Sequence, residues 1–156
     1  MTQSDLMSRA IQLAIENVRA RRGGPFGAVV ARQGEIIAEG TNLVTSANDP
    51  TAHAEIVAIR GACHKLATFQ LSGCEIYASC EPCPMCLGAV YWSRPDRLYI
   101  AANRSDAAMA GFDDAFIYAE LAAPPDRRRI PMSVLTHPLT RAPFEEWQLL
   151  ERRISY

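Results

Sequence analysis

Two short clusters in the sequence carry side chains that can bind a metal ion. The first is the tripeptide His53-Ala54-Glu55, and the second is the segment Cys80–Cys86, which reads Cys-Glu-Pro-Cys-Pro-Met-Cys. Imidazole nitrogens and thiolate sulfurs are preferred zinc ligands, and a catalytic zinc uses three protein ligands and leaves a fourth position for water. The residue types therefore indicate a site for Zn²⁺ that acts on a water molecule.

The spacing of these residues suggests which of them bind the metal. Cys83 and Cys86 are three residues apart, and Pro84 between them suits the first turn of a helix, so both thiols can point at one ion. Free N–H groups and the positive dipole end at that helix N-terminus favour the thiolate form. His53, at the expected start of another helix, supplies a third ligand. Glu55 then lies close to the metal without binding it and is free to move protons.

The remaining cysteines leave one alternative ligand pair open. Cys80 lies three residues before Cys83, so spacing alone also permits Cys80 and Cys83 as ligands. We prefer Cys83 and Cys86 because a helix is expected to begin between them, which makes Cys80 a packing residue at the end of a strand. Cys63 and Cys74 fall on apolar faces and are predicted to be core thiols. A purely structural zinc site would need a fourth ligand, and Cys80 alone has the right spacing for that role.

The segments around the two clusters alternate between helical and strand patterns. A first helix is expected over 4–22, started by Ser4 or Asp5, and two strands around Gln33-Gly34 form a hairpin. This alternation predicts an α/β fold, a three-layer α/β/α sandwich around a mixed five-stranded sheet, in one domain that spans residues 1–156. The expected strands are 26–32, 35–42, 75–79, 97–102 and one near 132–135, and the later helices are 51–66, 84–91, 113–121 and 143–154.

The composition excludes several classes of partner. The chain has 16 Lys and Arg against 17 Asp and Glu, a net charge of −1, which argues against a phosphate-binding surface and a polybasic membrane patch. No apolar run approaches the roughly 18 residues that a spanning helix needs. The first residues, Met-Thr-Gln-Ser-Asp, lack the features of a signal peptide, and five cysteines make a poor disulfide framework. We therefore expect a cytoplasmic protein with no membrane and no nucleic-acid partner.

His-x-Glu, an intervening strand and Pro-Cys-x-x-Cys occur here in the order that is the signature of zinc-dependent deaminases. At these residues the sequence resembles the cytidine/deoxycytidylate deaminase superfamily, and within it the bacterial guanine deaminases. The Gly-Phe-Asp-Asp stretch and the terminal tyrosine favour guanine among the superfamily's substrates. The resemblance covers Gly24–Val29, Asn48–Glu55, Ser79–Gly88, Ala110–Asp114 and Tyr156.

The resemblance implies a cytidine deaminase-like fold and hydrolytic conversion of guanine, a small purine base, to xanthine and ammonia. Glu55 would move a proton from water to a ring nitrogen, and Asp114 would share the proton transfer to the leaving amine. Asp113, the neighbouring residue, remains an alternative to Asp114 from sequence alone. Two carboxylates on opposite sides of one reacting carbon divide the acid and base work in a chemically sensible way.

The resemblance also assigns residues to substrate recognition. Asn42 would present its amide to the base, the backbone of Ala54 would contact it, and Phe26 would supply a stacking surface. Independently of the resemblance, Trp92 on a helix could be a core or a pocket-wall residue, and we expect it to form a pocket wall. Tyr156 would close the pocket, because the family uses its C-terminus as a lid, and this segment can be exchanged between the two subunits of a homodimer.

A tRNA adenosine deaminase is the main alternative, because it shares the same ligand signature. Such an enzyme needs a basic docking face, whereas residues 144–156 contain Arg152 and Arg153 against three glutamates, so RNA is disfavoured. Guanosine, cytosine or an aminotriazine such as ammeline are alternative small substrates because they share an amidine-like edge. A zinc-binding module without catalysis is the alternative from a different class.

Overall fold

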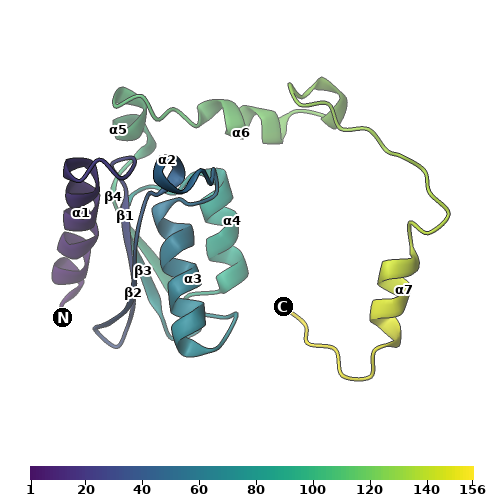
Figure 1. Ribbon diagram of the computed structural model, residues 1–156, viewed down its shortest axis with the longest axis horizontal. Helices are drawn as coiled ribbons and strands as arrows, with labels where there is room; N and C mark the ends of the chain where they lie inside the picture. The colour runs from purple at the N-terminus through teal and green to yellow at the C-terminus, as the bar shows by residue number, and fades with distance from the viewer. The chain divides into compact units, whose positions relative to one another are not determined.

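The computed structural model describes residues 1–156 and divides them into two compact units, Met1–Ala115 and Phe116–Tyr156. The first unit contains one sheet with the strand order β2-β1-β3-β4 (Figure 1). β1 pairs antiparallel with β2 and β3, whereas β3 and β4 are parallel, so the predicted mixed sheet is confirmed. The strands are β1 (Gly27–Arg32), β2 (Glu35–Thr41), β3 (Glu75–Cys80) and β4 (Arg97–Ala102).

Helices cover both faces of this sheet, which gives the predicted three layers (Figure 1). Alternate residues of the central strand β1 divide between two apolar clusters, because successive side chains of a strand point to opposite faces. Val29 and Ala31 pack with α1 (Gln3–Arg19), and Ala28 and Val30 pack in the cluster that includes α3 (Ala54–Leu66) and α4 (Pro84–Ser93). β1 is therefore buried on both sides and anchors the first unit.

The first helix begins at Gln3, one residue before the predicted start at Ser4, and ends at Arg19. Thr2 is its N-cap: the Thr2 hydroxyl accepts from the N–H of Asp5, and the Asp5 carboxylate accepts from the N–H of Thr2. This reciprocal pair is a capping box, in which Asp5 occupies the third helical position rather than the cap. These hydrogen bonds also lower the pKa of Asp5.

Two short helices of the first unit were not predicted. They are α2 (Val44–Ala47) and α5 (Arg104–Met109), both too short to show a helical repeat of apolar residues. The second unit contains most of α6 (Ala115–Ala122), a 3₁₀ turn at Pro125–Arg127 and α7 (Ala142–Leu149). No helix of the chain is both long and apolar enough to cross a membrane.

The predicted fifth strand near 132–135 is wrong for this structure. Residues 132–135 have no regular structure, and Val134 and Leu135 are 95% and 87% exposed. A strand needs a neighbour for its backbone hydrogen bonds, and the second unit contains no other strand with which this segment could pair. The apolar pattern that suggested a strand therefore marks an uncovered apolar segment.

β2 packs closely against α3 at Gly40. A Cβ atom added at Gly40 would overlap the carbonyl oxygen of Ala54 and lie 2.6 Å from the nitrogen of Ala58, whereas one added at Gly88 in α4 would meet nothing within 4 Å. We expect Gly40→Ala to lower the free energy of unfolding by on the order of 1–3 kcal/mol through overpacking. Gly88→Ala is the control and should be neutral or stabilising by up to about 1 kcal/mol.

Urea unfolding of both variants measures these differences, and zinc content reports whether the start of α3 has moved. Equal stability of the two variants would show that the close approach at Gly40 does not constrain α3.

Candidate metal centre and catalytic site

Local sequence places His53 and Glu55 at the N-terminus of α3. His53 is the N-cap residue, with extended backbone angles, and Glu55 lies in the first turn. The turn before the helix is held by Asp49, whose carboxylate accepts from both the N–H and the hydroxyl of Thr51 at 2.8 and 2.7 Å. The helix lies close to β2 because Gly40 has no side chain. Turn and glycine together set the position of the imidazole.

The second helix N-terminus carries the two thiols. Cys83 is the N-cap of α4, Pro84 is its first residue, and Cys86 follows in the first turn. This is the arrangement that the Pro-Cys-Pro-x-Cys spacing predicted. A proline at the first helical position loses no hydrogen bond, since that N–H has no partner within a helix.

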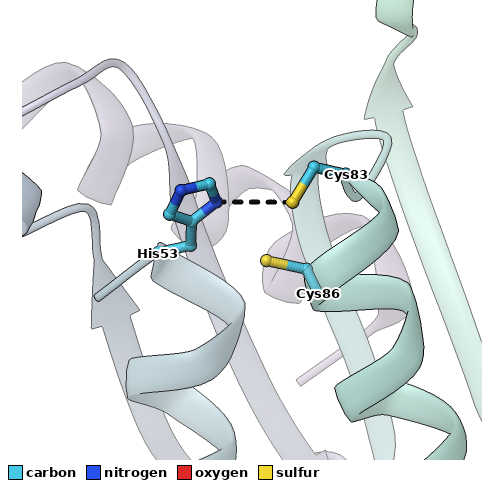
Figure 2. A group of neighbouring side chains, drawn as sticks. All are labelled: His53, Cys83 and Cys86. Carbon is cyan, nitrogen blue, oxygen red and sulfur yellow. Dashed lines mark hydrogen bonds between the residues drawn. The ribbon is translucent and has the colours of Figure 1, made fainter. Parts of the chain in front are cut away.

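The three donor groups converge between α3 and α4 (Figure 2). The ligand atoms of His53, Cys83 and Cys86 all lie within 4.8 Å of one another, and His53 Nδ1 is 3.6 Å from Cys83 Sγ. Zinc–nitrogen and zinc–sulfur bonds in a tetrahedron separate ligand atoms by about 3.5–4 Å, so the spacing fits Zn²⁺. One nitrogen and two sulfurs also match the three-ligand set of a catalytic zinc.

Cys80 lies outside this group. Its sulfur contacts the backbone carbonyl of Asn103 at 3.5 Å, and its side chain is buried at the end of β3, as expected for a packing residue. Burial raises the pKa of the Cys80 thiol, which disfavours the thiolate that a metal needs. All five cysteines are free thiols; Cys74 is fully buried and Cys63 partly buried, in line with core positions.

The protonation of the three side chains in the cluster favours the binding of a cation. Hydrogen bonds from Cys86 and His53 lower the pKa of Cys83 to about 4, so Cys83 is a thiolate at neutral pH. The same interaction with Cys83, together with burial, raises the pKa of Cys86. The pKa of His53 is raised chiefly by its hydrogen bond to Cys83. One thiolate, one thiol and one imidazole therefore lie together, and a metal ion that bound here would displace the remaining protons.

Glu55 is a buried carboxyl group beside the cluster. It is 7% exposed, and its Oε2 accepts from Cys86 Sγ at 3.4 Å. Burial is the main cause that raises the pKa of Glu55. A raised pKa favours the protonated form, which suits this carboxyl group to taking up and releasing a proton during a reaction.

The structure distinguishes the two neighbouring aspartates. Asp113 is exposed, and its Oδ1 accepts from the N–H of Ala115 at the start of α6 at 2.9 Å. Asp114 is half-buried, and its pKa is raised first by burial and further by the negative charge of Cys83. Asp114 is thus the aspartate that interacts with the metal-binding cluster, whereas the Asp113 carboxylate bonds to the backbone two residues further on.

Arg104 is a charged neighbour of Asp114 that sequence reasoning missed. Its positive charge lowers the pKa of Asp114, opposing the larger effect of burial. Arg104 itself is held by Glu81, through contacts of 3.4 Å to its Nε and 3.2 Å to its backbone N–H. Glu81 is part of the Cys80–Cys86 segment, so its place in the sequence could have pointed to a charged partner near the cluster.

Asn42 is buried at the end of β2, and the oxygen of its side-chain amide is hydrogen-bonded. Its Oδ1 accepts from the backbone N–H groups of Gly24 and Val44, both at 3.3 Å. Because both partners are donors, the side-chain oxygen faces them and the NH₂ group is left to donate elsewhere. Ala54, at the first position of α3, is fully buried.

Phe26 is half-buried and packs edge-to-face against Phe112, with ring centroids 5.0 Å apart and an interplanar angle of 88°. Sequence reasoning assigned no role to Phe112, although it lies directly before the two aspartates. Pairs of this geometry hold both rings in place. The ring of Phe26 is therefore fixed by a residue of the Gly-Phe-Asp-Asp stretch.

The two remaining predicted site residues, Trp92 and Tyr156, are exposed within their own units. Trp92 is 64% exposed on α4. It follows Cys86 by six residues, which places it about 120° around the helix axis and roughly 9 Å further along. Tyr156 is the last residue of the second unit and is exposed there.

An α/β/α sandwich with a His-Cys-Cys cluster at two helix N-termini and a buried glutamate beside it defines the class of zinc-dependent deaminases. Residues 1–102 match the family described as the cytidine and deoxycytidylate deaminase zinc-binding region, and the chain belongs to this family.

The chain is similar to relatives with two kinds of activity. It is 51% identical to the guanine deaminase of Bacillus subtilis (strain 168) over 156 residues, 100% of both chains. The X-ray structure of that guanine deaminase matches with a TM-score of 0.98 over 100% of this chain and 99% of the other. A structure of guanine deaminase from Nitrosomonas europaea has a TM-score of 0.69 and 40% identity over 72% of this chain and 65% of the other. The tRNA-specific adenosine deaminase of Aquifex aeolicus (strain VF5) is 46% identical over 78 residues, 50% of this chain and 52% of the relative.

The cluster geometry predicts which cysteines retain zinc. Cys86→Ser should reduce zinc from about one equivalent per chain to below roughly a tenth after dialysis, because a weakened ligand set loses 10–100-fold or more in affinity. Cys80→Ser, three residues from Cys83 on its other side, is the matched control and should retain zinc. Metal analysis of the dialysed proteins measures both. Loss of zinc from Cys80→Ser with retention by Cys86→Ser would assign the site to the alternative pair.

Proposed function

We propose that this chain catalyses the hydrolytic deamination of guanine to xanthine and ammonia. The observation that carries the proposal is the 51% identity to a guanine deaminase along the whole chain, since it extends past the metal-binding region through Asp114 to the last residue. The match to the tRNA adenosine deaminase of Aquifex aeolicus covers half of this chain. The reaction forms a C–O bond from water and breaks the C–N bond to the exocyclic amine.

We assign His53, Cys83 and Cys86 as the ligands of a catalytic zinc ion. When bound there, zinc lowers the pKa of a coordinated water towards neutrality and so supplies the nucleophile. The thiolate character of Cys83 and the clustering of the three donor atoms within 4.8 Å support this assignment.

Glu55 carries the proton that the attacking water loses. Its Oε2 lies beside Cys86 at the edge of the cluster, and burial raises its pKa, so it can hold that proton. It then delivers the proton to a ring nitrogen next to the reacting carbon, which makes that carbon more electrophilic. The second proton of the water, carried on the new hydroxyl group of the tetrahedral intermediate, passes through Asp114 to the amine, which leaves as ammonia.

Asn42, Phe26 and Ala54 recognise the base in this proposal. The side-chain NH₂ of Asn42 donates to an acceptor on the ring edge, since its oxygen is already bonded to two backbone N–H groups. Phe26 supplies the stacking surface, and the backbone of Ala54, at the start of α3, contacts the base. Trp92 remains a proposed wall residue that has no support from its place on α4.

The second unit supports a homodimer, because it cannot bury its own apolar side chains. Large apolar residues are more than half exposed along most of it, and such a concentration is typical of a surface that packs on protein. We propose that this segment packs on the first unit as an exchanged arm between two subunits, with Tyr156 closing a pocket, and that both units then form one functional domain. These residues are Ile130, Met132, Val134, Leu135, Leu139, Phe144, Leu149, Leu150, Ile154 and Tyr156.

The five free thiols support a cytoplasmic location, because disulfides are rare in reducing compartments.

An ammonia-release screen of the purified protein tests the proposed reaction. It includes guanine, guanosine, ammeline, adenine, cytosine, cytidine and a tRNA anticodon stem-loop. The proposal expects guanine to give the highest kcat/KM. Guanine that stays inert while guanosine or RNA reacts would overturn it, and no ammonia from any compound would favour a non-catalytic zinc module.

Glu55→Gln should retain zinc and lose turnover. The amide keeps the size of the side chain but cannot carry a proton, and general acid–base catalysis is worth about 10²–10⁴-fold. Glu39→Gln is the control, since Glu39 pairs with Arg9 on the surface away from the cluster. Guanine kinetics and metal analysis are measured together, and near wild-type turnover by Glu55→Gln would remove the proton-carrying role.

Asp114→Asn and Asp113→Asn form a second matched pair. Asp114→Asn should lower kcat by about 10²-fold if the carboxyl moves a proton to the amine. Asp113→Asn should retain most activity, because an amide oxygen can still accept from the N–H of Ala115. Steady-state kinetics with guanine measure kcat for both variants. A larger loss of kcat in Asp113→Asn than in Asp114→Asn would assign the proton transfer to Asp113.

Val134→Asp combined with Leu135→Asp tests the dimer. Charges at positions that pack on protein should dissociate the subunits and lower activity, because an unpaired buried charge is strongly unfavourable. Arg127→Asp changes charge on an exposed residue of the same unit without removing apolar area and is the control. Light scattering measures the mass, and a monomeric wild-type chain with full activity would contradict the exchanged arm.

A further inference from the structure

Asn17 is a fully buried polar residue on a helix face that is otherwise apolar. The other buried residues of α1 are leucines and alanines, and Asn17 continues the same face in the last turn of the helix. An apolar residue at this position would pack against the sheet in the same way, so the amide itself requires an explanation.

Both hydrogen bonds of the Asn17 side chain go to backbone carbonyls of the loops that carry the proposed recognition residues. Its Nδ2 donates to the carbonyl of Gly24 at 3.0 Å and to the carbonyl of Asn42 at 2.8 Å. Because both partners are acceptors, the amide nitrogen must face them, which uses both of its N–H groups. Its Oδ1 is buried without a hydrogen-bond partner.

These two bonds close a network around the substrate residues. The N–H of Gly24 donates to Asn42 Oδ1 at 3.3 Å, and the Gly24 carbonyl also accepts from the N–H of Phe26 at 2.9 Å. The N–H of Asn42 donates in turn to the Phe26 carbonyl at 3.2 Å. At Gly23 a Cβ atom would overlap the Asn42 carbonyl, so the loop runs directly against the end of β2.

We propose that Asn17 is a positioning residue for base recognition. Through its two hydrogen bonds it holds the amide of Asn42 and the ring of Phe26 in their binding geometry. The inference rests on the proposed roles of those two residues. The unpaired oxygen supports it, because a buried polar atom without a partner is unfavourable and is retained where the rest of the group has a specific task. That task is to hold the backbone carbonyls of Gly24 and Asn42 in place.

Asn17→Leu tests the inference, since it keeps the approximate volume and removes both hydrogen bonds. We expect KM for guanine and the inhibition constant of xanthine to rise about tenfold, with kcat changed less than about threefold and zinc content unchanged. Leu6→Ala is the control: Leu6 is buried in α1 far from the loop, so its loss lowers stability without moving Asn42. Amide exchange in residues 23–26 and 42–44 should accelerate in Asn17→Leu and not in Leu6→Ala.

A double-mutant cycle with Asn42→Ala separates positioning from plain stability. If Asn17 acts through Asn42, Asn17→Leu should raise KM much less in the Asn42→Ala background than in the wild type. Three results would overturn the inference: an unchanged KM in Asn17→Leu, a KM change that Leu6→Ala reproduces, or additive effects in the cycle. An Asn42→Ala variant with wild-type KM would overturn the role of Asn42 and the inference with it, while guanine turnover itself would stand.

Discussion

The site depends on the meeting of two helix N-termini over one face of the sheet. His53 and Cys83 are the N-cap residues of α3 and α4, and their ligand atoms lie 3.6 Å apart. Helix starts favour negative charge, so thiolates and a nearby carboxylate are less costly there than elsewhere in the interior. The glycine at position 40, the turn at Asp49 and the proline at position 84 all serve to bring these two ends together.

The two helix N-termini also allow the carboxyl group of Glu55 to be buried, which would be unfavourable elsewhere in the interior. Glu55 is buried next to two sulfurs, and burial raises its pKa, yet Cys86 gives it a hydrogen bond. A carboxyl group in these surroundings can exist in both protonation states, which is the property that proton transfer needs. Asp114, also raised in pKa by burial and by Cys83, is placed by the loop after α5 so that two carboxyl groups interact with one cluster.

The residues of the metal centre were predictable because their positions are encoded locally. Proline at position 84 marks a helix start, and three-residue spacing places Cys83 and Cys86 on one side of it. The long elements were likewise predictable from apolar periodicity. The fifth strand was not, because strand formation depends on a partner and not on the apolar content of residues 132–135.

Features that depend on contacts between distant segments were not visible in the sequence. Asn17 bonds to residues 7 and 25 positions away, and its place on the apolar face of α1 does not indicate which residues these are. Asp113 and Asp114 could not be distinguished from the sequence. They differ because Asp114 is more buried, whereas Asp113 accepts a hydrogen bond from the N–H at the start of α6. Trp92, predicted from the sequence to be a wall residue, is 64% exposed on α4.

Zinc titrated into metal-free protein, with guanine deamination and bound metal measured at each step, tests whether guanine turnover occurs at one zinc ion bound by this cluster. We expect activity to rise in proportion to bound zinc and to stop rising at about one equivalent per chain. Full guanine turnover by the metal-free protein, or no turnover at full zinc occupancy, would contradict this expectation.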